Sequence, residues 1–195
     1  MAKYTDVYKY AGSGQEVEGI YKGYRKSFGF VIMPDGIDDI YVSVENKGSA
    51  MHNDKVRVRI LGSTAGNQKK EGLVVEVLER ANETIVGTYD RQQSFGFVIP
   101  DDERIGEDVY VALENTMNAR SGAKVLVKII SWPEKKRKAE GIITEILGYE
   151  GDVGLDINCI MANHKIPFSF PKQVLDESLR IDNIIRNNPK RLDLR

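Results

Sequence analysis

The sequence predicts a mainly β fold, in which two small five-stranded β-barrels in tandem precede a short helical segment. Three observations support this prediction. A block of about 65 residues occurs twice, each copy contains five short runs of β-branched and aromatic residues, and the apolar pattern turns helical after Gly148. We expect an N-terminal extension at 1–15, barrels at 16–80 and 81–148, and a helical linker at 149–195.

The repeat defines the two barrels. The segment Ser27–Ile32 recurs residue for residue as Ser94–Ile99, and Asp39–Val42 recurs as Asp108–Val111 with one conservative change. The offset between copies is 67 residues at the first block and 69 at the second. A two-residue insertion in the predicted loop 101–107 explains the difference. Two copies of this length indicate two small domains and exceed the length of most solenoid repeats.

The local pattern within each copy is typical of strands. Val56, Val58 and Ile60 alternate with charged residues, as expected when one face of a strand is buried. Turn formers such as Pro34-Asp35-Gly36 separate the runs. Five short strands with turns at this spacing predict a small closed barrel. In the first copy these runs are 17–24, 28–33, 39–44, 55–61 and 72–79.

Two helices are predicted after the second barrel. Residues 156–164 carry apolar side chains at a helical period, with Asp156 as the N-cap and Pro167 after the end. A second helix is predicted from Lys172 to about Ile185, opened by Pro171.

Aromatic residues are the candidate binding groups. Phe28 and Phe30 lie two residues apart, so they share one face of a strand, and Tyr41 joins them if the neighbouring strands pair. The alternative is that these rings are core residues, but alternation already supplies an interior from other residues: Val31, Ile40, Val42, Val56, Val58 and Ile60. We therefore predict two stacking platforms: Phe28, Phe30 and Tyr41 in the first copy, and Phe95, Phe97 and Tyr110 in the second.

Basic residues lie near both platforms in the sequence. Lys22, Arg25 and Lys26 precede the first and Arg91 precedes the second, and we predict that they meet a nucleic-acid backbone. The roles of two further features are each left between two alternatives. The run Lys135–Lys138 is either a solvated hairpin loop or a phosphate guide, and Trp132 is either a further stacking group or a loop anchor.

Composition limits the function classes. The formal net charge of −1 argues against a protein that grips duplex nucleic acid mainly through phosphates. The lone cysteine, Cys159, cannot form an internal disulfide, and no signal peptide or membrane span is evident, so we expect a cytoplasmic protein without membrane association. The only histidines, His52 and His164, are far apart in sequence. We predict no catalytic residues, no metal site and no cofactor in this chain.

The motifs Ser-Phe-Gly-Phe-Val-Ile and Asp-Ile-Tyr-Val resemble the RNA-binding motifs of cold-shock domains, which have the OB fold. In free-standing cold-shock proteins a histidine occupies the positions that are Ser43 and Ala112 here, so one stacking partner per barrel is missing. The tandem arrangement is similar to the N-terminal region of RNase R/RNase II exoribonucleases. The segments that extend this resemblance are Ala50–Val56, Val153–Ile157, Phe170–Leu175 and Arg191–Arg195.

This resemblance implies single-stranded RNA binding, as the substrate-capturing region of a 3′-to-5′ exoribonuclease. Its Mg²⁺-dependent aspartate cluster would lie beyond Arg195, so the chain as given is not expected to be an enzyme. The acidic runs Asp38-Asp39, Asp101–Glu103 and Glu107-Asp108 are interpreted as solvated turn residues. Stacking would also accept single-stranded DNA. The alternatives are a free-standing cold-shock-type RNA-binding regulator or chaperone, and a protein-interaction module.

Overall fold

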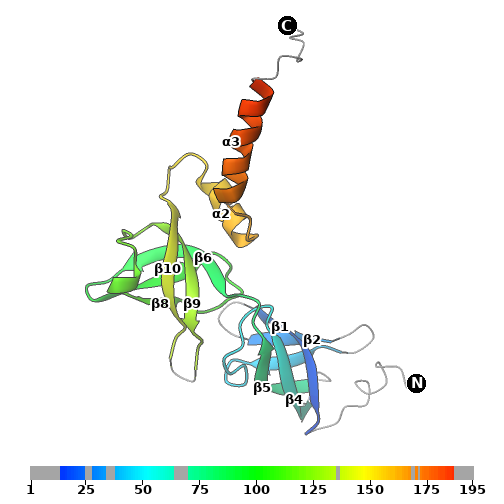
Figure 1. Ribbon diagram of the computed structural model, residues 1–195. Coiled ribbons are helices and arrows are strands. Elements are labelled where there is room, and N and C mark those ends of the chain that lie inside the picture. The colour runs from blue at the N-terminus through cyan, green and yellow to red at the C-terminus, as the bar shows by residue number, and fades with distance from the viewer. Residues whose placement is uncertain are drawn as a thin grey trace. The chain divides into compact units, whose positions relative to one another are not determined.

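A computed structural model of the chain describes residues 14–24, 28–33, 38–63, 70–134, 137–167, 170 and 172–186. The first barrel is closed, with the strands neighbouring one another in the order β1-β2-β3-β5-β4 (Figure 1). Antiparallel pairing of β1 with β4 completes the circle. The strands are β1 (Glu16–Tyr24), β2 (Phe28–Ile32), β3 (Ile40–Ser43), β4 (Lys55–Ser63) and β5 (Lys70–Glu79).

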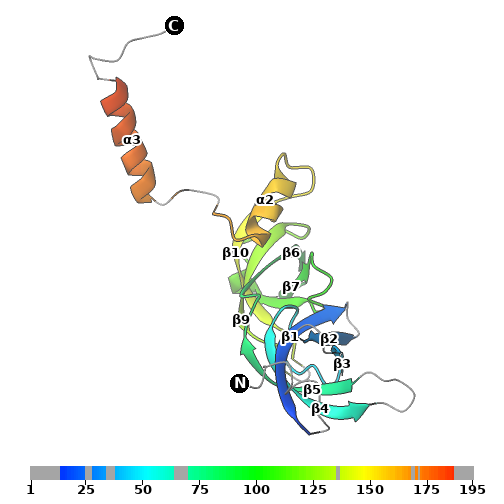
Figure 2. The same ribbon diagram turned by 90° about the vertical axis from the view of Figure 1, so that its right-hand side faces the viewer.

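The second barrel repeats this topology. Its strands are neighbours in the order β10-β8-β7-β6-β9, again as a closed barrel. In both barrels the third and fifth strands pair in parallel, through Tyr41 and Glu71 in the first and Tyr110 and Glu140 in the second. The elements are β6 (Thr84–Arg91), β7 (Phe95–Pro100), β8 (Val109–Ala112), the 3₁₀ helix η1 (Leu113–Asn115), β9 (Lys124–Ser131) and β10 (Glu140–Gly148) (Figure 2). The predicted pair of five-stranded barrels is confirmed.

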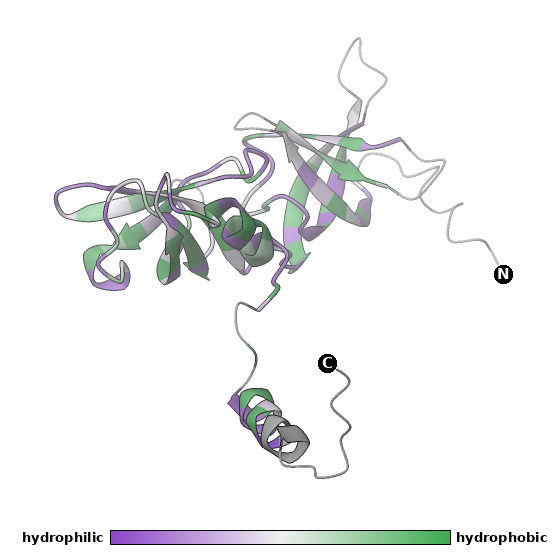
Figure 3. Ribbon diagram, turned by 90° about the horizontal axis from the view of Figure 1, so that it is seen from above, coloured by the Kyte–Doolittle hydropathy of each residue, from purple (hydrophilic) through white to green (hydrophobic). Residues whose placement is uncertain are grey.

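The inward-pointing apolar side chains, at every second position of the strands, fill each barrel. Polar and apolar residues follow one another along the strands in Figure 3. In the first barrel, all six residues predicted for the interior are 2% exposed or less. Tyr21 and Tyr89 were not predicted to lie in the core, yet both rings are buried there, at 3% and 0% exposure.

These two tyrosines explain the glycine within each Phe-Gly-Phe motif. A Cβ atom at Gly29 would lie 2.5 Å from the ring of Tyr21, and one at Gly96 would lie 2.3 Å from the ring of Tyr89. Real Cβ atoms do not approach other atoms so closely. The glycine therefore lets a large ring pack directly beneath the strand that carries the two phenylalanines.

A buried ion pair lies where the two barrels meet. The Asp54 carboxylate is 0% exposed and accepts hydrogen bonds from Arg80 Nη1 at 2.8 Å, from Ala81 N at 3.0 Å and from Met51 N at 3.0 Å. The Arg80 guanidinium lies 4.1 Å from the ring centroid of Trp132, which packs against the core of the second barrel. Trp132 is thus an anchor at this junction, the second of the two alternatives that the sequence left open.

The loop 101–107, which contains the insertion of the second copy, also contacts the first barrel. The backbone oxygen of Arg104 would be 2.4 Å from a Cβ atom at Gly23, so the loop passes directly over the end of β1. Glu107 Oε1 accepts a hydrogen bond from Lys47 Nζ at 2.5 Å. Both barrels belong to one compact unit of the chain.

Two helices follow in a separate unit: α2 (Leu155–Asn163) and α3 (Lys172–Arg186). Their existence is confirmed, with one correction. Asp156 lies in the first turn of α2 and is not its N-cap, because the helix already begins at Leu155. Pro171 lies outside the described residues. Neither helix, as far as the description reaches, is long and apolar enough to cross a membrane.

Candidate nucleic-acid interface

The structure brings the six predicted rings together as two groups of three. We call Phe28, Phe30 and Tyr41 the first platform, and Phe95, Phe97 and Tyr110 the second platform. Ring centroids are 5.7–5.8 Å apart in the first and 5.3–6.1 Å apart in the second. All six rings are half-buried, whereas Val31 and Val98 of the same strands point inward. The rings therefore lie on the outer face of each barrel, where a base could reach them.

Strand pairing fixes the arrangement of each platform. Tyr41 is the register partner of Phe30, and Tyr110 is the register partner of Phe97. Ser43 is opposite Phe28 and Ala112 is opposite Phe95. Ser43 and Ala112 occupy the positions where free-standing cold-shock proteins have a histidine. Both therefore lie beside the rings, and both carry small side chains.

The buried tyrosines support the platforms from within the barrels. Burial, and secondarily the charge of Glu107, raises the pKa of Tyr21 to about 12. Burial also raises the pKa of Tyr89. Both tyrosines are therefore neutral at physiological pH and act as apolar supports.

The predicted basic residues occupy different positions. Lys22 is the register partner of Phe30, and its Nζ donates a hydrogen bond to Asn53 Oδ1. Arg91 is the register partner of Gly96, and strand alternation therefore turns it away from the face of the rings; its backbone amide donates to Ser121 Oγ at 2.9 Å. Arg25 and Lys26 lie outside the described residues. A role of these four residues in binding stays a prediction.

Tyr24, which was not predicted as a binding residue, lies beside the first platform. Its ring stacks on Phe28 with centroids 5.1 Å apart and planes 23° apart, and the residue is 56% exposed. The signal was present in the alternation, because Tyr24 follows Lys22 by two residues and shares its face of β1.

In the second barrel, Lys138 is the residue beside the platform that was not predicted individually. Its Nζ lies 4.5 Å from the ring centroid of Phe97 and 3.2 Å from Asp108 Oδ2. Within the basic run, Lys135 and Lys136 lie outside the described residues. The structure thus places one member of this run on the second platform.

Charged side chains on β1, β4 and β5 of the first barrel neutralise one another. Arg57 bonds Glu76 at 2.7 Å and Glu18 at 3.3 Å, and Arg59 bonds Glu16 at 2.7 Å. These pairs use basic side chains that would otherwise attract a phosphate. They therefore reduce the positive charge that β4 presents to a phosphate.

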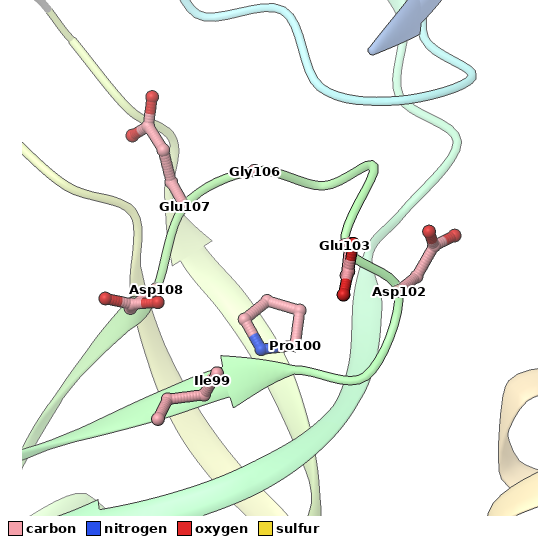
Figure 4. Close-up of a pocket in the computed structure, with 7 residues that line it drawn as sticks. All are labelled: Ile99, Pro100, Asp102, Glu103, Gly106, Glu107 and Asp108. Atoms are coloured by element: carbon pink, nitrogen blue, oxygen red, sulfur yellow. The ribbon is translucent and has the colours of Figure 1, made fainter. Parts of the chain in front are cut away.

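The acidic runs of the second barrel surround a cavity of about 250 Å³ (Figure 4). Ile99 and Pro100 form its apolar lining, and Asp102, Glu103, Glu107 and Asp108 line it with carboxylates. Asp102 bonds Arg104 at 2.8 Å, which holds the pKa of that carboxyl below its usual range, and Glu107 and Asp108 bond lysines. Over the described ranges no three acidic, histidine or cysteine side chains converge as metal ligands would.

The described histidines occupy different environments. His52 is buried at the junction of the barrels, and burial together with the nearby Arg104 lowers its pKa. His164 is exposed and follows α2 in the other unit of the chain. His52 is therefore a packed, neutral residue at neutral pH.

Comparison with known proteins agrees with this architecture. Residues 19–77 match the family described as the ribonuclease B OB domain, and residues 97–171 match the cold shock domain family. Ribonuclease R of Thermotoga maritima is 33% identical over 181 residues, which cover 91% of this chain and 25% of that protein. Ribonuclease R of Escherichia coli is 32% identical over 181 residues, with coverages of 92% and 22%.

A solved structure shares the fold. RNase R of Mycoplasma genitalium, in complex with ribose-methylated single-stranded RNA, matches with a TM-score of 0.70 and 22% identity, covering 91% of this chain and 29% of that one. The chain spans about a quarter of the length of the curated relatives it matches. The two barrels thus match an OB-domain and a cold-shock-domain family, and the similarity to the ribonuclease R proteins runs along nearly the whole chain.

Proposed function

We propose that this chain binds single-stranded RNA on the outer faces of its two barrels. One observation carries the proposal: three half-buried rings recur in the same register on the outer surface of each barrel. Stacking of a base on an aromatic side chain contributes about 1–3 kcal/mol, whatever the base. A chain with a net charge of −1 needs such a contribution, because it cannot rely on phosphate attraction alone.

The names and lengths of the relatives support a biological role for the barrels. The curated relatives carry the name ribonuclease R and are about four times longer than the matched region. We assign to the barrels the capture of unpaired RNA for a 3′-to-5′ exoribonuclease activity that resides elsewhere in such a protein. Asp102, Glu107 and Asp108 of the second-barrel loop each pair with a lysine or an arginine, and we expect no RNA hydrolysis by this chain with Mg²⁺.

The test is a double substitution, Phe28→Ala with Phe95→Ala, which removes one ring from each platform. Binding of a labelled, unstructured RNA should weaken about tenfold or more, since each lost stacking contact is worth at least 1 kcal/mol. The matched control is Leu61→Ala with Ile130→Ala, two exposed apolar residues on β4 and β9 outside the platforms. Circular dichroism and thermal unfolding report whether each variant is folded.

The outcomes separate the proposal from its rivals. Equal affinity of the folded double variant and the control would contradict stacking on the platforms. No RNA binding by the wild-type chain at low salt would instead favour a protein-interaction module. Detectable binding of single-stranded DNA would show that the platforms do not select the sugar.

A further inference from the structure

The outer faces of the two barrels can be compared row by row, because strand pairing gives each residue its counterpart. In the first barrel, Lys22 pairs with Phe30, which pairs with Tyr41. In the second barrel, Asp90 pairs with Phe97, which pairs with Tyr110. The rings agree, but a cation in one barrel is replaced by an anion in the other.

The residues opposite Phe28 and Phe95 also differ, and again the first barrel has the side chain better suited to bind RNA. Tyr24 is the register partner of Phe28. In the second barrel this place belongs to Gln92, whose backbone amide donates to the carbonyl oxygen of Phe95 at 2.8 Å. The first barrel thus has four rings in contact, with Tyr24 stacked on Phe28 and more than half exposed, whereas the second has three.

The charges at these positions have different surroundings. Lys22 bonds the neutral side-chain oxygen of Asn53, so this contact leaves its positive charge uncompensated. Asp90 accepts hydrogen bonds from Ser121 Oγ at 3.0 Å and from Gln92 Nε2 at 3.1 Å, which fix a carboxylate beside the second platform. A phosphate that follows bases across the rings is attracted at the first site and repelled at the second.

The second platform has its own cation, Lys138, but this cation is already engaged. It lies over the face of Phe97 and pairs with Asp108. A base that stacks on Phe97 must displace this contact. Lys138 therefore does not compensate for Asp90 as a free cation would.

Resting on the proposed function, we infer that the first barrel is the primary site for single-stranded RNA, and that Tyr24 and Lys22 make it so. Tyr24 extends the first platform by one stacking position. Lys22 contacts the phosphate that joins the stacked nucleotides. The second barrel is a weaker site, which RNA occupies after the first.

Reciprocal exchange of the two differing positions tests this inference in the full chain. Lys22→Asp with Tyr24→Gln gives the first barrel the residues of the second, and it should weaken binding of an unstructured RNA about tenfold or more. Asp90→Lys with Gln92→Tyr gives the second barrel the residues of the first, and it should tighten binding several-fold. Lys128→Asp, an equal charge change at an exposed position on β9, is the control and should have a smaller effect than the first exchange.

The single variants Tyr24→Gln and Gln92→Tyr separate stacking from charge and keep the test valid if a double variant does not fold. Opposite effects of these two single variants support the inference. Provided that the wild-type chain binds RNA, the inference is overturned by either of two results. Both exchanges weaken binding equally, or neither exchange changes the affinity. Loss of binding in the wild-type chain itself would instead contradict the proposed function.

Discussion

The two barrels are closely similar inside and differ at their surfaces. Tyr21 and Tyr89 occupy the same place beneath Gly29 and Gly96. Yet Lys22 faces Phe30 where Asp90 faces Phe97. Closure of a small barrel leaves space for one arrangement of interior rings, so both copies retain it. The outer face is free of that constraint, and there the copies have acquired opposite charges.

The loop that precedes the fourth strand of each barrel shows the same contrast. In the first barrel this loop contains Met51, which packs in the core of the second barrel, and Asp54, which pairs with Arg80 where the two barrels meet. The equivalent positions in the second barrel are Arg120 and Ala123, and there the backbone amide of Arg120 contacts the hydroxyl of Tyr149 at 3.4 Å. The duplicated loop is thus a junction in one copy and a contact with the segment after β10 in the other.

The largest expected effect concerns this junction. Asp54→Ala removes a fully buried carboxylate, so that two backbone amides lose their acceptor and the Arg80 guanidinium loses its counter-ion. We expect the free energy of unfolding to fall by about 3–5 kcal/mol. Chemical denaturation measures it. Asp101→Ala, which breaks a partly exposed pair with Lys124, should cost about 1 kcal/mol or less. A cost at Asp54 no greater than that of the control would show that the junction is not a stabilising contact.

A smaller effect is expected from the device that both barrels share. Gly29→Ala and Gly96→Ala each force a Cβ atom against a buried tyrosine ring. Each should lower stability by about 1–3 kcal/mol, by similar amounts in the two barrels. Ser43→Ala, on the neighbouring strand, serves as a control and should change stability by no more than about 0.5 kcal/mol.

A double-mutant cycle identifies the cause of that loss. Gly29→Ala combined with Tyr21→Leu should cost less than the sum of the two single changes, because the smaller side chain leaves room for the methyl group. Additive costs would mean that the glycine is needed for another reason, such as backbone conformation. Repeating the cycle with Gly96 and Tyr89 extends the comparison to the second barrel.

These features divide into those that the sequence could predict and those that it could not. Alternation of Val56, Val58 and Ile60 and the repeated Phe-Gly-Phe motif were enough to predict both barrels and both platforms. The junction could not be predicted, because contacts such as Asp54 with Arg80 join distant residues without a local pattern. The difference between Lys22 in the first barrel and Asp90 at the same place in the second could not be predicted either. Pairing aligns β1 with β6 at a different offset from that of the Phe-Gly-Phe motifs, and only the observed register reveals it.

Titration of Tyr21 should have a still smaller effect on the free energy of unfolding, and only at alkaline pH. Tyr21 has a pKa of about 12 in the folded chain, against about 10 when exposed in the unfolded chain. Between these values the unfolded state loses a proton that the folded state keeps, so stability is full below pH 10 and falls as the pH rises towards 12. Tyr21→Phe should make unfolding less sensitive to pH in this window. The same sensitivity in the variant and the wild type would mean that other groups cause the loss.

The smallest expected effect is on RNA binding by the second barrel. Lys138→Gln removes a cation that already pairs with Asp108 and covers Phe97, so the lost phosphate attraction is partly offset by a more accessible ring. We expect affinity to fall by about twofold, less than for Lys22→Gln, and the dependence on salt to change less too. Fluorescence titration at two salt concentrations measures both quantities. If Lys138→Gln weakened binding more than Lys22→Gln, the second barrel would supply the main phosphate contact and the order of the two sites would be reversed.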